Sequence, residues 1–193
     1  MRQNVSLAEI SDGHLYKAND MVKADCGGCE GCSQCCRGMG NSIILDPYDV
    51  YRLTTGIGKS MQELLATSVE LNVVDGVILP NLKMQGTREA CAYLDTEGRC
   101  SIHPYRPGIC RLFPLGRHYE NGGLFYFLQT GECAKENRSK VKVSKWIDTP
   151  ELKRNEQFKL QWHDLLSAMT DRVAGEDEGK QREENLLLLR LFY

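Results

Sequence analysis

The most regular apolar periodicity in the chain lies near its C-terminal end. Between residues 158 and 173, apolar side chains recur every three or four residues, which predicts an amphipathic helix. Thr149 and Pro150 precede it as a capping residue and a proline that the first turn tolerates. We expect residues 174–179 to interrupt the helix and residues 180–193 to form a last one. The apolar stripe consists of Phe158, Trp162, Leu165, Leu166, Met169 and Val173.

Two shorter helices are predicted earlier in the chain. Asp46 followed by Pro47 is a favourable start, and Gly56 predicts an end near Thr54. Ser60 begins the capping-box pattern S-x-x-E, which predicts a second helix directly after it. The apolar positions expected to be buried on these helices are Val50, Tyr51, Leu53, Met61, Leu64 and Leu65.

Short β-branched and aromatic runs between turn residues predict strands. Residues 41–45 and 123–128 have this composition, and an Asn-Gly turn signal precedes the second run. Residues 72–82 are predicted to form a hairpin that turns at Asp75-Gly76. Residues 91–102 are predicted to form a smaller hairpin that brings Cys91 close to Cys100. Residues 1–25 are expected to form a short helix or two, or an ordered arm. The expected fold class is α+β: a small irregular cysteine-rich domain with short β-hairpins, packed against several helices.

Composition limits the classes of protein to consider. With 41% hydrophobic and 26% charged residues, a core can form without help from cysteines. The net charge of −2 gives no indication of binding to nucleic acid or to an anionic membrane. The sequence shows neither the apolar segment of a signal peptide nor a run long enough to span a membrane, so we expect a cytoplasmic location. In that reducing compartment, nine cysteines favour metal ligation or redox chemistry over disulfides.

The cysteines concentrate in residues 26–36, where five of the nine occur in the order C-x2-C-x2-C-x2-C-C. The glycines of this segment leave no apolar surroundings for buried, unligated thiols. Closely spaced thiolates are what soft or borderline metals require. Four of the five also fit the C-x2-C-x2-C-x3-C run of bacterial ferredoxins, although Arg37 stands where ferredoxins have proline and the run has no second copy. Those four are Cys26, Cys29, Cys32 and Cys36.

The adjacent pair Cys35-Cys36 is the most informative detail of this segment. Side chains of neighbouring residues diverge, by about 100° in a helix and to opposite faces in a strand. One tetrahedral ion is therefore an awkward partner for both thiolates. The pair predicts two metal positions or a multinuclear cluster.

Residues 29–36 form the pattern C-x2-C-x2-C-C. Further cysteine motifs follow downstream: Cys91-Ala-Tyr-Leu-Asp, the segment from Cys100 through Cys110 to Pro114, and Gly131-Glu-Cys133. In these motifs the chain resembles the YkgJ-type cysteine-cluster family, a zinc- or iron-chelating domain also found in flagellin lysine N-methylases. The ligand set that this resemblance implies is Cys29, Cys32, Cys35, Cys36, Cys91, Cys100, Cys110 and Cys133. Cys26 lies outside the signature and remains a further candidate.

The resemblance implies metal chelation but leaves the metal open. An iron–sulfur cluster, with 4Fe–4S favoured, is the first hypothesis, and a redox or transferase role would accompany it. The alternative is a zinc protein with two structural tetrathiolate sites and no catalysis, or a metal-handling module. The methylases are larger, so methyl transfer is not carried over, and no catalytic residue, membrane, nucleic acid or protein partner is assigned.

Two further expectations concern organisation and charge. We expect residues 1–193 to form a single domain, with a metal-binding core at 26–133 and a helical appendage at 149–193 that packs on it. Arg106 and Arg111 flank Cys110 and could either offset thiolate charge or form ordinary structural pairs. His103 lies between Cys100 and Cys110, where packing or support of a ligand is expected rather than ligation.

Overall fold

The computed structural model of the chain describes residues 6–27, 32–135 and 137–193. Its elements, in chain order, are α1 (Leu7–Ile10), β1 (Met21–Asp25), η1 (Gln34–Cys36), α2 (Pro47–Ile57), α3 (Met61–Thr67), β2 (Val69–Val74), β3 (Val77–Leu82), β4 (Met84–Gln85), β5 (Ala90–Cys91), η2 (His103–Tyr105), α4 (Gly108–Leu112), β6 (Leu115–Glu120), β7 (Gly123–Leu128), β8 (Ser139–Lys142), α5 (Val143–Ile147), α6 (Leu152–Val173) and α7 (Glu178–Phe192).

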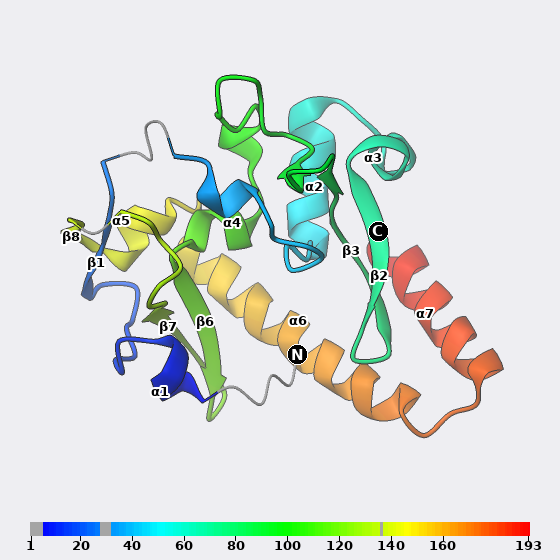
Figure 1. Ribbon diagram of the computed structural model, residues 1–193. Helices are drawn as coiled ribbons and strands as arrows, with labels where there is room; N and C mark the ends of the chain where they lie inside the picture. The colour runs from blue at the N-terminus through cyan, green and yellow to red at the C-terminus, as the bar shows by residue number, and fades with distance from the viewer. Residues whose placement is uncertain (1–5, 28–31, 136) are drawn as a thin grey trace.

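The strands pair only in twos, and every pair is antiparallel. β2 with β3 and β6 with β7 form local hairpins. β1 instead pairs with β8, and all the cysteines lie between these two strands in the sequence. The long helix α6 runs along one side of the molecule, past β6–β7 near its start and the β2–β3 hairpin and α7 near its end (Figure 1). Helices and short hairpins together make the predicted α+β fold, which is confirmed.

Three apolar clusters hold these elements together. The first joins β1, β6, β7 and α5, and the third joins β3 to α6 and α7. The second is formed mainly by α2, α3 and the hairpin β2–β3, and Cys91, Cys100 and Cys110 pack against it. Three of the cysteines are therefore attached to the core through the second cluster.

Several predicted elements are confirmed at or close to their expected positions. The turn residues Asp75 and Asn121 have positive φ and begin the tight turns of the two large hairpins. Asp46 and Ser60 each complete a capping box with the residue three positions later. The apolar stripe of residues 158–173 packs into the third cluster, and the last helix spans Glu178–Phe192.

Other boundaries differ from expectation. Residues 41–45 contribute only an isolated bridge from Ile44 to Asn81 and do not form a strand. Thr149 does not cap α6, which instead begins after Glu151 in a left-handed conformation. Tyr51 and Leu65, expected to be buried, are 62% and 37% exposed, because α2 and α3 cover the core with a narrower face than predicted.

Gly56 does not end α2 as predicted. The helix continues to Ile57 and ends at Gly58, whose φ of 71° gives the usual left-handed cap. A Cβ atom at Gly56 would lie 2.3 Å from the ring of Tyr105, so the glycine permits close packing of η2 against the helix. This contact places the segment that precedes Cys110 against α2.

Candidate metal centre

Eight of the nine cysteines lie in the described residues, and Cys29 lies outside them. All eight are partly buried and none of these eight is in a disulfide. They come from separate segments: the residue after β1, the segment around η1, β5 and the turn after it, α4, and the loop after β7. The eight are Cys26, Cys32, Cys35, Cys36, Cys91, Cys100, Cys110 and Cys133.

Cys91, Cys100 and Cys110 pack against the second apolar cluster, and the charges of Cys91 and Cys110 act on Cys36; we call these four thiols the inner group. The charge of Cys35 also acts on Cys91, Cys100 and Cys110. Burial raises the pKa of the Cys91 and Cys100 thiols. It raises the pKa of Cys110 well above its ordinary value, and the charges of Cys91 and Cys100 add to that increase. Because each thiolate disfavours its neighbours, four negative charges at this place need a compensating cation. The expected proximity of Cys91 and Cys100 is confirmed.

Local backbone structure explains how the inner group is held. Leu94 and Cys100 form an isolated antiparallel bridge around the turn at Asp95, whose backbone N–H donates to the carbonyl of Arg99 over 2.9 Å. This is the small hairpin expected from the sequence, reduced to a single bridge. Cys91 itself belongs to β5, which pairs with β4.

The adjacent thiols of Cys35 and Cys36 contact each other in the 3₁₀ turn η1, which was not expected from neighbouring positions. The Cys36 thiol donates a hydrogen bond that lowers the pKa of Cys35 to about 7; burial opposes the shift, and the charge of Arg106 adds to it. The same hydrogen bond, burial and the charges of Cys91 and Cys110 raise the pKa of Cys36. The pair thus favours one thiolate and one thiol when no metal is bound.

A second set of thiols lines a small pocket, and we call these four the outer group: Cys26, Cys32, Cys35 and Cys133. The volume of this pocket is about 20 Å³, room for one atom-sized occupant. Gln34, Phe113, Pro114, Ala134 and Lys135 complete its lining. Cys36 is not among the lining residues, whereas Cys35 both lines this pocket and adds its charge to Cys91, Cys100 and Cys110.

Arg106 and Arg111 have different roles in the structure. Arg111 donates to the carbonyl oxygens of Pro104 and Asp148, each over 2.7 Å, and so ties η2 and α5 to α4. Arg106 has a buried Nε with no hydrogen-bond partner among the described residues, and its charge acts on Cys35 and Cys100. Arg106 is therefore the cation available to the thiolates, whereas Arg111 holds the backbone. His103, by contrast, is exposed.

A buried ionic cluster supports the segment that carries Cys110. Asp49 accepts a hydrogen bond of 2.8 Å from the backbone N–H of Gly108, and its other carboxylate oxygen lies 3.7 Å from Nζ of Lys159. Lys159 also pairs with Asp46, and all three charged side chains are buried. Burial raises the pKa of Asp49 to about 6 and lowers the pKa of Lys159 to about 7, whereas pairing of the ammonium with the carboxylates acts in the opposite direction.

This ionic cluster was not predicted from the sequence. Lys159 lies three residues before Trp162, within the apolar stripe of α6, and a lysine at that position signals a buried partner. Asp49 lies in the first turn of α2, where an acidic residue is common and gives no sign of a distant partner. Its contact with Gly108 joins residues 59 positions apart.

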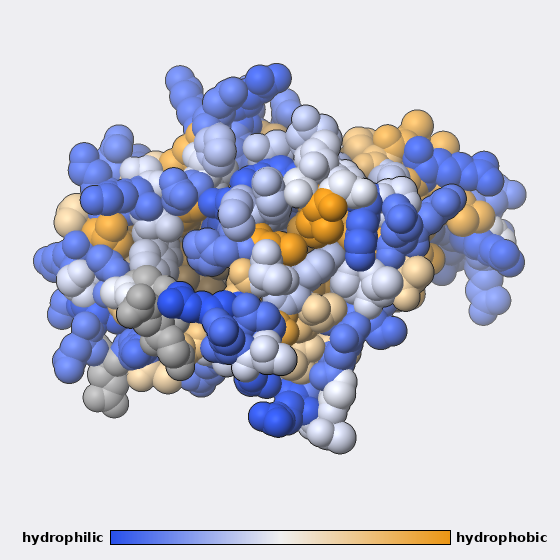
Figure 2. Space-filling view, turned by 90° about the horizontal axis from the view of Figure 1, so that it is seen from above, coloured by the Kyte–Doolittle hydropathy of each residue, from blue (hydrophilic) through white to orange (hydrophobic). Residues whose placement is uncertain are grey.

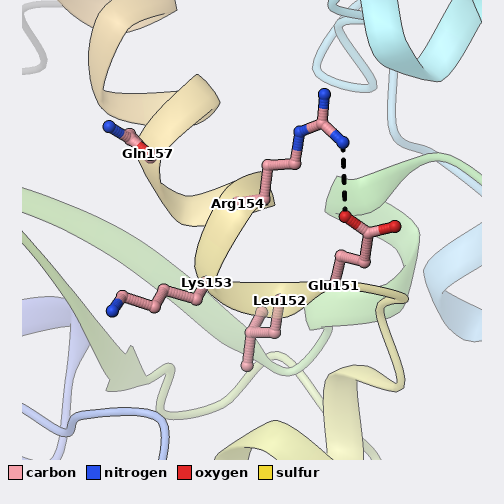
Figure 3. Close-up of a pocket in the computed structure, with 5 residues that line it drawn as sticks. All are labelled: Glu151, Leu152, Lys153, Arg154 and Gln157. Atoms are coloured by element: carbon pink, nitrogen blue, oxygen red, sulfur yellow. Dashed lines mark hydrogen bonds and ion pairs between the residues drawn. The ribbon is translucent and has the colours of Figure 1, made fainter.

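Another hollow on the described surface, about 420 Å³, has no cysteine among its lining residues. It surrounds the start of α6, where Arg154 pairs with Glu151 over 3.4 Å and Lys153 points in a different direction (Figure 3). Viewed from above, the face of the molecule is mostly hydrophilic with scattered apolar patches (Figure 2). In the described part of the chain, no helix is long and apolar enough to cross a membrane.

The conformation described does not by itself present a finished metal site. Among residues 6–27, 32–135 and 137–193, no three His, Cys, Asp or Glu side chains are placed to hold one ion. The donor chemistry does fit a thiophilic metal, since the described thiols form two neighbouring groups joined by Cys35 and Cys36.

Comparison with known proteins identifies the family. Residues 28–140, more than half of the chain, match the model of the CxxCxxCC family, described as "Putative zinc- or iron-chelating domain". The chain belongs to this family. No curated protein and no solved structure matches the chain. The CxxCxxCC match includes every described cysteine except Cys26, and it supports metal binding without distinguishing iron from zinc.

Proposed function

We propose that the chain is a metal-chelating protein whose inner group of cysteines holds an iron–sulfur cluster, with 4Fe–4S the favoured type. The observation that carries the proposal is the division of the ferredoxin-like run in space. Cys36, its last member, lies with Cys91 and Cys110, whereas Cys26 and Cys32 line the outer pocket. In ferredoxins with two clusters, the last cysteine of such a run also serves a different cluster from the first three.

The electrostatics of the inner group support a permanently bound cationic centre. Burial and mutual repulsion raise the pKa of its thiols, so the metal-free protein keeps them largely protonated. A cationic centre would reverse this preference, and metal binding would release protons. The unpartnered Nε–H of Arg106 can donate to a sulfur atom that carries excess negative charge.

In this proposal the protein residues bind and tune the centre. Cys36, Cys91, Cys100 and Cys110 supply the four thiolates, and the ionic cluster around Asp49 holds the backbone just before Cys110. When bound, the cluster supplies one-electron redox chemistry. The sequence and the geometry assign no substrate, and the cytoplasmic location stays a prediction.

Structural zinc is the second candidate function. Eight described thiols divide into two groups of four, and closed tetrathiolate sites are how zinc stabilises small irregular folds. Such sites would leave no open coordination position for a reaction.

Anaerobic purification followed by analysis of iron, zinc and acid-labile sulfide separates the two candidates. We expect visible absorbance from sulfide-to-iron charge transfer, iron and sulfide in equal amounts, and loss of both in Cys110→Ser. A colourless protein that contains about two zinc ions and no sulfide would rule out the cluster. Leu191→Ser, at an exposed position on α7, serves as a control that should keep the full metal content.

A further inference from the structure

Three guanidinium groups gather around η2. Arg52 of α2 and Arg111 of α4 both donate to the carbonyl oxygen of Pro104, over 2.6 and 2.7 Å. Arg106 follows η2 directly, and burial together with the charges of Arg52 and Arg106 lowers the pKa of Arg111. Partial burial and the charges of Arg106 and Arg111 also lower the pKa of His103. Positive charge is therefore concentrated around this short helix.

Carboxylates offset only part of this charge. The carboxylate of Asp148 lies 3.9 Å from Nη1 of Arg111, but its side chain is exposed, so water screens the pair. The charges of Arg52 and Arg111 also act on Asp49, a buried carboxylate that pairs with Lys159. No other acidic residue occurs in α2, η2 or α4. Together with the arginine after η2, these three elements carry a net positive charge.

Aromatic side chains lie beside these arginines at the surface. Tyr105 of η2 is partly exposed, and its ring packs against Gly56, one turn along α2 from Arg52. Tyr51, next to Arg52, is exposed and stacks on Tyr48 with ring centroids 6.4 Å apart. Tyrosine and arginine are enriched at the centres of protein–protein interfaces, because both combine a large contact area with hydrogen-bond donors. We call the following residues the arginine face: Tyr51, Arg52, Pro104, Tyr105, Arg106 and Arg111.

A second basic surface, on β1 and β8, has a simpler explanation. Lys23, Lys140 and Lys142 are exposed there. Lysines on exposed strands ordinarily prevent pairing with other chains, and their flexible side chains give no fixed geometry. The guanidinium groups at η2 are instead positioned by carbonyl oxygens, and a guanidinium can bind a carboxylate through two parallel N–H bonds.

We propose that the arginine face is a docking surface for a partner protein that presents a cluster of carboxylates. Arg52 is the central anchor, because among the described residues its guanidinium donates only to Pro104 and keeps N–H groups for a carboxylate. Since η2 lies between Cys100 and Cys110, and the charge of Arg106 acts on Cys100, the partner binds beside the inner group. The proposal does not depend on which metal the cysteines hold.

The test measures binding of a fluorescently labelled peptide of about ten glutamates to the full-length, anaerobically purified chain by fluorescence anisotropy. Arg52→Glu should weaken binding by about tenfold or more, and Arg52→Lys, which keeps the charge but not the planar group, should lose less. Tyr51→Glu, at an exposed position that does not support the fold, should also weaken binding. Added salt should weaken binding by the unmodified chain more than binding by Arg52→Glu.

Lys140→Glu makes the same change of charge on the exposed strand β8 and is the matched control, which should bind within about twofold of the unmodified chain. The proposal is overturned if the unmodified chain does not bind the peptide, or if neither Arg52→Glu nor Tyr51→Glu weakens binding. An equal loss in Lys140→Glu, or binding of labelled oligothymidine in place of the peptide, would overturn it as well. Elemental analysis of each protein keeps the two proposals apart: absence of iron from all of them would refute the cluster, and the peptide would still test the arginine face.

Discussion

Arg106 is the charged residue that links the two groups of thiols. Its charge lowers the pKa of both Cys35 and Cys100, and its buried Nε–H has no partner in the described part of the chain. An unsatisfied buried donor costs about 1–3 kcal/mol, and a sulfur atom of a bound metal centre would be a suitable acceptor for it.

Arg106→Gln should therefore shift the pH dependence of metal binding. Without the cation, the pKa of Cys35 and Cys100 rises, the thiolate fraction at a given pH falls, and protons compete more strongly with the metal. We expect the binding midpoint to move upward by about half a pH unit or more, measured by Co²⁺ titration between pH 5.5 and 8.5. Arg154→Gln, which alters an exposed arginine, is the matched control and should leave the midpoint in place.

The adjacent cysteines make a separate prediction. Cys35→Ser and Cys36→Ser should each reduce metal content, because the charges of both thiols couple to those of the inner-group cysteines. Elemental analysis of the two variants, prepared side by side, measures the metal that each retains. Full occupancy in either variant would contradict a role of both adjacent cysteines in metal binding.

At the scale of elements, the ionic cluster joins α2, α4 and α6. Lys159 and Asp49 are buried, at 3% and 4% exposure, so removal of the lysine leaves two carboxylates without their cation. Lys159→Met should lower the free energy of unfolding by about 3–5 kcal/mol, measured by urea denaturation. Lys153→Met, on the exposed start of the same helix, should change it by no more than about 0.5 kcal/mol. Equal stability of the two variants would show that the buried pair contributes nothing.

Elements with strong local signals were the predictable ones. The hairpins turn at Asp75-Gly76 and Asn121-Gly122, where positive φ at both residues demands such sequences. The helices after Asp46 and Ser60 begin at capping boxes that two side chains and the backbone determine. Local chemistry of this kind can be read from a few consecutive residues.

Elements that depend on distant partners could not be predicted. β1 exists because Val22 pairs with Val141, more than a hundred residues later, and no local pattern marks either strand. Gly56 was predicted to end α2, but its real role is to make room for the ring of Tyr105. Because Tyr105 belongs to η2, far along the sequence, this role could not be recognised from the residues around Gly56. Residue spacing alone could not show such contacts.

The same distinction applies to the whole molecule. Motif spacing was enough to nominate nine cysteines, but their division into an inner and an outer group depends on two non-local arrangements. One is the pairing of β1 with β8, which brings Cys26 beside the loop of Cys133. The other is the packing of Cys91, Cys100 and Cys110 on the second apolar cluster.

This arrangement predicts that metal removal loosens only part of the molecule. The described members of the first and third apolar clusters include no cysteine, and they retain their buried contacts when the metal leaves. The second cluster packs directly against three inner-group cysteines. Without a metal, their thiolates repel one another, and burial of these charges destabilises the folded segment. Local unfolding should therefore begin in the segment from β5 to α4.

Hydrogen–deuterium exchange before and after anaerobic treatment with a chelator measures this directly. We expect faster exchange in residues 90–112 and unchanged protection in α6 and in the hairpin β6–β7, because the apolar contacts of these elements do not involve the metal. Cys110→Ser, already without the inner metal, should show the fast pattern at the outset and respond little to the chelator. Equal acceleration along the whole chain would mean that the metal supports every cluster, and that the three clusters unfold as a single cooperative unit.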